Sequence, residues 1–170
     1  MTQGQTDNEM RIILKRYLGQ YHRAKNKQRV LQNRLREIQA ELKHPGVSSA
    51  PLDGVGAENR VSMGAAALVF REAEIVERIQ RQVELEATAV TNIMDILDFL
   101  PADSTEKFIL ELRHIDCKPW SEIARTVHLT RSPCNEYYNR GLDKLLTFKK
   151  VRSILADFES MLDITEHDGY

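Results

Sequence analysis

Cysteines, aromatic residues and long apolar runs are all scarce in this chain of 170 residues. The two cysteines, Cys117 and Cys134, are too few for the disulfide framework of a small secreted protein. The N-terminus lacks the basic and apolar tract of a signal peptide, and no apolar run approaches the ~20 residues that a membrane-spanning helix needs. We therefore expect a cytoplasmic protein whose thiols stay reduced.

Net charge is nearly absent as well, because 24 basic residues face 25 acidic ones. A total of −1 argues at first against a strongly basic nucleic-acid-binding protein. The charges are segregated, however: residues 11–43 hold ten basic and two acidic residues, and residues 72–111 hold three basic and ten acidic ones. Residues 120–152 carry +4 and residues 153–170 carry −5. A locally basic surface is therefore compatible with the near-neutral total.

A seven-residue repeat predicts a long first helix. From Met10 to Leu42 apolar or tolerated residues alternate at spacings of three and four, with Gln28 as the polar exception. We expect residues 1–10 to be disordered before this helix. Residues 44–62 are rich in Gly, Pro and Ser, which predicts a flexible loop.

A second heptad helix is expected from Met63 to Leu100, with Ser62 as its N-cap. Its predicted seam has valines at strict sevens, including Val69, Val76 and Val83, with Ile79, Ile93 and Leu100 at the companion position. Because the two helices have opposite net charge, residues 11–100 are predicted to form a long antiparallel, coiled-coil-like helical hairpin. Its seam is expected to be intramolecular, and self-association as a homodimer or contact with another protein stays open.

Residues 101–150 are predicted to be a small helix-turn-helix domain, which makes the expected fold all-α. Pro119 begins a short helix, His128 and Leu129 form a turn, and Thr130 is placed to cap the following helix. The predicted core of the domain consists of Trp120, Ile123, Ala124, Val127, Leu129, Cys134 and Leu142.

The outer face of the last helix in this domain carries residue types that contact DNA. Arginine can bind guanine or phosphate, and asparagine can pair with adenine. Serine can contact either of these bases, and glutamate can accept a hydrogen bond from cytosine. The candidate DNA-binding residues are Thr130, Arg131, Ser132, Asn135, Glu136, Asn139 and Arg140.

The stretch FILELRHIDCKPWSEIARTVHLTRSPCNEYYNRGLDKLL resembles region 4 of bacterial sigma factors, the helix-turn-helix that reads the −35 promoter element. The whole chain is similar to phage-encoded transcriptional regulators of the RinA and ArpU type. This resemblance implies a bacteriophage or prophage regulator in the bacterial cytoplasm, an activator of late genes that binds double-stranded DNA and acts with RNA polymerase. A second sigma module is not recognisable, so a complete sigma factor is not expected.

Two other functions fit the same pattern. A small terminase-like DNA-packaging subunit also joins a helix-turn-helix to oligomerising helices, and a sigma-mimicking inhibitor would bind polymerase without binding DNA. We expect neither an enzyme, because no catalytic motif is present, nor a cofactor. The spacing of the histidines and cysteines around the turn is also poor for zinc. Residues 151–170, which are rich in acidic side chains, are expected to form a partly helical tail. This tail would dock on the helix-turn-helix domain or screen its basic surface.

Overall fold

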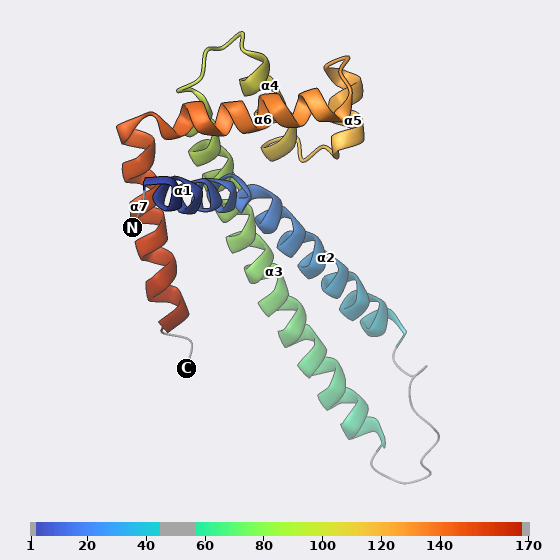
Figure 1. The fold of residues 1–170 in the computed structure, drawn as a ribbon. Helices are drawn as coiled ribbons and strands as arrows, with labels where there is room; N and C mark the ends of the chain where they lie inside the picture. The colour runs from blue at the N-terminus through green and yellow to red at the C-terminus, as the bar shows by residue number, and fades with distance from the viewer. Residues whose placement is uncertain (1–2, 45–56, 168–170) are drawn as a thin grey trace. The chain divides into compact units, whose positions relative to one another are not determined.

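The computed structural model describes residues 3–44 and 57–167, which form helices and their connections with no strand (Figure 1). The helices in these ranges are α1 (Gln3–Leu18), α2 (Gln20–Lys43), α3 (Ala57–Leu97), α4 (Thr105–His114), α5 (Trp120–Thr126), α6 (Arg131–Leu146) and α7 (Lys149–His167). The predicted all-α fold class is confirmed. Within the described ranges, no helix is long and apolar enough to cross a membrane.

The chain divides into two compact units. Unit 1 comprises Met1–Arg23 and Ala87–Tyr170, and unit 2 comprises Ala24–Glu86. The main hydrophobic core lies in unit 1, where α1, the end of α3 and α4 to α7 supply its side chains. Its fully buried members include Leu14, Leu18, Ile93, Ile96, Leu97, Ile109, Leu110, Ile123, Leu142, Leu145, Val151 and Leu155.

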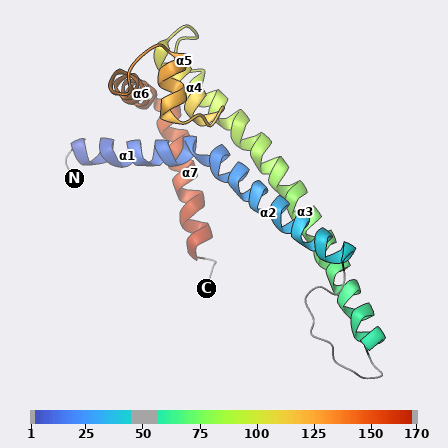
Figure 2. The ribbon, with the colours of Figure 1, turned by 90° about the vertical axis from the view of Figure 1, so that its right-hand side faces the viewer.

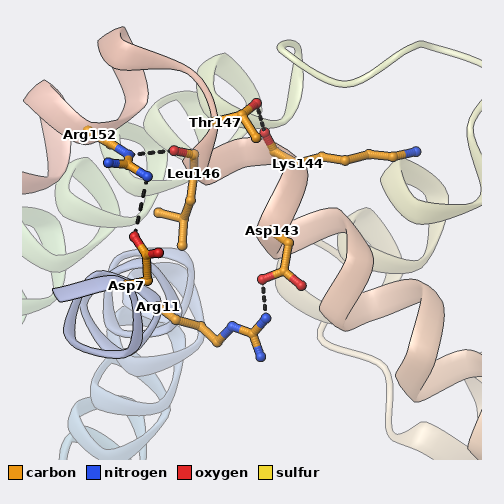
Figure 3. Close-up of polar contacts among 7 residues, drawn as sticks. All are labelled: Asp7, Arg11, Asp143, Lys144, Leu146, Thr147 and Arg152. Atoms are coloured by element: carbon orange, nitrogen blue, oxygen red, sulfur yellow. Dashed lines mark hydrogen bonds and ion pairs between the residues drawn. The ribbon is translucent and has the colours of Figure 1, made fainter. Parts of the chain in front are cut away.

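The N-terminal segment corrects one prediction, because residues 3–10 belong to α1 and are not disordered. Two ion pairs hold α1 against the junction of α6 and α7 (Figure 3): Arg11 pairs with Asp143, and Asp7 lies 3.4 Å from Arg152. Met10 also packs against the core. These partners lie more than 130 positions away along the chain, so local composition could not reveal them.

Gly19 separates α1 from α2, so the single long first helix of the prediction is two helices. The Arg23 guanidinium folds back over this point and donates to the Arg16 carbonyl at 2.5 Å. A Cβ on Gly19 would lie 2.9 Å from an Arg23 guanidinium nitrogen. The missing side chain therefore makes room for the arginine.

In unit 2, α2 and α3 run side by side in opposite directions (Figure 2). The Gln82 amide donates to the Ala24 carbonyl at 3.2 Å, and the Gln39 amide donates to the Glu72 carboxylate at 2.8 Å. Among residues 24–44 and 64–86, for which the structure describes burial, only Leu31 and Gln82 are buried. Six further large apolar residues of this unit are half-buried: Leu35, Ile38, Leu42, Leu68, Ile75 and Ile79.

The side of α3 that faces α2 agrees only in part with the predicted seam. Val69, Val76 and Val83 are 55%, 49% and 41% exposed, whereas Ile79, at the companion position of that seam, is half-buried together with Ile75. Both sets have heptad spacing, so periodicity alone did not show which of them meets α2.

The connection between α2 and α3 is shorter than the predicted loop at residues 44–62. Residues 57–62 are helical, because α3 begins at Ala57, and Ser62 therefore lies inside the helix and is not its N-cap. Residues 45–56 lie outside the described part of the chain. The far end of α3 is Leu97, three residues before the predicted end.

The acidic tail lies largely in α7, which is helical from Lys149 to His167. Val151 and Leu155 are fully buried in the core of unit 1, and the Phe158 ring meets the Tyr17 ring edge-on at a centroid distance of 5.1 Å. Residues 168–170 lie outside the described range. The apolar face of α7 is thus part of the fold of unit 1.

Candidate nucleic-acid interface

The support for the candidate interface is the close packing of α4 on α6. A Cβ on Gly141 would lie 2.8 Å from Cδ1 of Leu110 and 3.2 Å from Cβ of Glu106. Glycine at position 141 therefore lets α4 and α6 approach this closely, whereas any residue with a Cβ would force a neighbouring side chain or helix to move. At the start of α4, the Ser104 hydroxyl accepts a hydrogen bond from the Lys107 amide at 3.2 Å, as expected of an N-cap.

The turn between α5 and α6 is closed by backbone hydrogen bonds. His128 has a φ of 54°, and its amide donates to the Arg125 carbonyl at 3.3 Å. The Leu129 amide donates to the Ala124 carbonyl at 3.0 Å. This pair of bonds around a left-handed residue is the Schellman arrangement, which ends a helix sharply and redirects the chain. The turn therefore fixes where α6 begins.

The residues predicted to form the core around α5 and α6 are buried or half-buried. Ile123, Cys134 and Leu142 are fully buried, and Trp120, Ala124, Val127 and Leu129 pack against them. Burial raises the pKa of the Cys134 thiol, which keeps it protonated as a small apolar core residue.

Aromatic contacts fix α5 and the first half of α6 against α4. The Trp120 and Tyr138 rings meet edge-on at 5.2 Å, and the Arg113 guanidinium lies 5.3 Å from the Trp120 ring centroid. Arg113 also donates to the Lys118 carbonyl at 3.0 Å. Behind them, His114 Nε2 lies 3.2 Å from the Tyr138 hydroxyl. The first turns of α6 keep Arg131, Ser132, Asn135 and Glu136 exposed.

The first turns of α6 bring several predicted site residues together. Arg131, Ser132 and Asn135 are exposed and line one shallow depression with Trp120 of α5. Glu136 is also exposed, one position further along. Within the described residues, no ion pair holds Arg131, so its guanidinium is available to a ligand.

Thr130 precedes this group as the N-cap residue of α6. Its side chain makes no cap hydrogen bond, in contrast to the prediction that it caps the helix. The first turn of α6 also includes Pro133, which has no N–H to satisfy. The exposed Thr130 hydroxyl is therefore free to contact a ligand together with the amides at the helix start.

Asn139 and Arg140 are engaged within the protein. The Asn139 amide donates to the Asn135 carbonyl at 2.9 Å. The Arg140 guanidinium lies 5.0 Å from the Tyr137 ring centroid and 3.9 Å from the Glu106 carboxylate. Lys144 binds the same carboxylate at 2.7 Å, and its hydrogen bond is the largest cause that lowers the pKa of Glu106. Asn139 and Arg140 are therefore less available to a ligand than Arg131 and Asn135.

Sequence reasoning gave Trp120 only a core role. The structure leaves it half-buried, with one part against Tyr138 and another part in the depression beside Arg131. Its position directly after Pro119, at the start of a short helix, is the sequence signal that could have placed it near the start of α6.

Comparisons with protein-family models, with curated proteins and with solved structures found no match to this chain. The functional assignment therefore depends on the geometry of the site and on the sequence pattern.

Proposed function

We propose that this protein is a sequence-specific DNA-binding transcription regulator that places α6 in the major groove. The observation that carries the proposal is the exposed group of Arg131, Ser132 and Asn135 at the start of α6. A helix-turn-helix reads base edges with the first residues of its second helix, and these three side chains have the donors and acceptors for that task.

The rigid support of α6 favours base recognition over loose electrostatic binding. The Schellman turn fixes the helix start, and the contact of Gly141 with Leu110 fixes its distance from α4. Side chains on such a helix are held in register, which direct readout requires. The mixed charges of Arg131 and Glu136 on the exposed face also favour selective contacts over a uniformly basic surface.

Phosphate contacts would come from groups at the edges of this face. The amide groups at the start of α6 are partly positive and suit a phosphate oxygen. Arg125 at the end of α5 is exposed as well and could reach the same strand. With few basic groups involved, we expect modest affinity with a clear dependence on salt.

The finer part of the proposal rests on the resemblance of the sequence pattern to RinA- and ArpU-type regulators. In that role the protein would be an activator of bacteriophage late genes that binds a promoter together with bacterial RNA polymerase in the cytoplasm. The alternatives are a small terminase-like packaging subunit and an inhibitor that binds polymerase but no DNA.

Selection of bound sequences from a random duplex pool by the full chain tests the proposal. We expect enrichment of one motif whose length matches one or two major-groove contacts. A purified transcription assay on the enriched sequence then separates a regulator from a packaging subunit. A pool that stays random at low salt would contradict DNA recognition and favour the inhibitor.

A further inference from the structure

Unit 2 exposes more large apolar side chains than it buries. Its buried residues within the described range are Leu31 and Gln82, of which only the first is apolar. Its exposed large apolar residues are Val30, Val69, Phe70, Val76, Val83 and Leu85. Its other large apolar residues, such as Leu35, Ile75 and Ile79, are only half-buried, so the two helices gain limited stability from their own packing. Contiguous exposed apolar surface of this kind marks an interaction site.

Five of the exposed residues in α3 form a line that we call the valine stripe: Val69, Ala73, Val76, Gln80 and Val83. Their spacings of four, three, four and three are those of a heptad seam. The face of α3 toward α2 has the same spacing, in Leu68, Glu72, Ile75, Ile79 and Gln82. A helix with two heptad seams is built to pack against two neighbouring helices, and α2 accounts for one of them.

We propose that a second copy of this chain covers the valine stripe, with the two α3 helices packed antiparallel about a twofold axis. The stripe is complementary to itself in this orientation. If Val76 lies opposite Gln80 of the second copy, Ala73 lies opposite its Val83, so that a small side chain meets a larger one. Gln80 is the polar residue that can fix this register, as polar seam residues do in coiled coils.

The charges beside the stripe fit the same arrangement. Glu77 and Arg81 form an ion pair within α3 at 3.7 Å. In the proposed register, Glu77 of one copy and Arg81 of the other are only about 3 Å apart along the direction of the helix axes, given a rise of ~1.5 Å per residue. Residues 24–86 contain ten basic and nine acidic residues, so two copies do not repel each other through net charge.

The acidic residues of α3 argue against other occupants. Glu77 and Glu84 lie beside the stripe, and such carboxylates disfavour a DNA duplex or an anionic lipid surface. A basic amphipathic helix of another protein is the remaining alternative, and it predicts a monomer when the chain is studied alone.

Sedimentation equilibrium of the purified full chain tests the proposal. We expect a mass of twice 19.6 kDa at micromolar concentration. The double variant Val76→Glu/Val83→Glu should be monomeric, with a dissociation constant raised at least a hundredfold and an unchanged helical circular dichroism spectrum. Val30→Glu is the matched control, because Val30 is also exposed but lies on α2, and it should stay dimeric. A monomeric wild-type chain, or a double variant that still dimerises, would overturn the proposal.

Cysteine cross-linking tests the antiparallel orientation. The double variant Ala73→Cys/Val83→Cys should form an interchain disulfide, because the proposed register places these positions opposite each other. Each single variant places its two thiols about 15 Å apart along the axis and should not cross-link. The wild-type chain is the control for disulfides formed through the native Cys117 and Cys134. Cross-linking by Ala73→Cys alone would indicate parallel helices and overturn the arrangement. Neither experiment contains DNA, so its failure is distinguishable from failure of the proposed function.

Discussion

Nε2 of His114 lies 3.2 Å from the hydroxyl of Tyr138, and their rings stack with centroids 5.8 Å apart. This pair joins α4 to α6 behind the exposed face that we assign to DNA. Burial, the largest cause, lowers the pKa of His114 from 6.5 to about 4 and also raises the pKa of Tyr138. The fold therefore requires a neutral imidazole at this position.

The lowered pKa of His114 predicts acid sensitivity. The unfolded chain binds this proton near pH 6.5 and the folded chain only near pH 4, so stability is complete above 6.5 and falls as the pH drops toward 4. Urea unfolding should show that the free energy of unfolding falls by about 2 kcal/mol more in the wild type than in His114→Gln between about pH 7 and 4.5. Identical pH dependence of the two proteins would contradict this account.

Gly141→Ala should destabilise unit 1 by about 1–3 kcal/mol, because the added methyl group overlaps the Leu110 side chain. The clash outweighs the gain of up to ~1 kcal/mol that alanine brings to a helix interior. Gly64→Ala is the matched control, since nothing lies within 4 Å of its added Cβ, and it should be neutral or stabilising. Denaturant midpoints measure both. A stabilised Gly141→Ala variant would show that α4 and α6 are not closely packed.

The turn between α5 and α6 gives a substitution that should increase stability. Because His128 has a φ of 54°, His128→Gly should relieve backbone strain and stabilise the fold by about 0.5–1 kcal/mol. The same change at His22, inside α2, should destabilise by about 0.5 kcal/mol. Thermal unfolding compares the two variants. A lower melting temperature for His128→Gly would contradict the left-handed turn.

The contact between Tyr17 and Phe158 predicts that α7 contributes to stability. Phe158→Ala should lower the free energy of unfolding by about 2 kcal/mol, because it removes a half-buried ring and an edge-on aromatic contact. Met161→Ala, at an exposed position on the same helix, should change it by less than about 0.5 kcal/mol. Equal effects of the two substitutions would indicate that α7 does not dock through this ring.

Local sequence signals were sufficient to predict which residues of α5 and α6 are buried. The spacing of Ile123, Cys134 and Leu142 depends on contacts between neighbouring helices, and all three are buried as predicted. The role of α1 could not be predicted in the same way, since Asp7 and Arg11 find their partners at the other end of the chain. Long-range ion pairs leave no periodic signal in a sequence.

The helices of unit 2 illustrate a different limit of sequence reasoning. Valines are more apolar than glutamines, so Val69, Val76 and Val83 were the natural choice for the intramolecular seam. The structure places Gln82 there, together with Ile79 from the companion position of the predicted seam, and leaves the valines exposed. Hydrophobicity predicts that a residue will be buried, but it does not specify whether its own chain or another copy buries it.

The candidate site shows the same distinction between residue type and environment. Arg131 and Arg140 are equivalent by type and both lie on the outer face of α6. Only the structure shows that Arg140 already contacts Glu106 and Tyr137. This difference separates the two arginines experimentally.

The most direct test of DNA recognition by α6 is the affinity of wild type, Arg131→Ala and Arg140→Ala for the duplex enriched by selection, measured by fluorescence anisotropy at one salt concentration. Arg131→Ala should lose about 1–3 kcal/mol of binding free energy, or roughly tenfold to a hundredfold in affinity. Arg140→Ala should lose less than about 1 kcal/mol, because its guanidinium already contacts Glu106 and the Tyr137 ring. Wild-type affinity of Arg131→Ala, with the fold intact by circular dichroism, would contradict the assignment of α6 as the recognition helix.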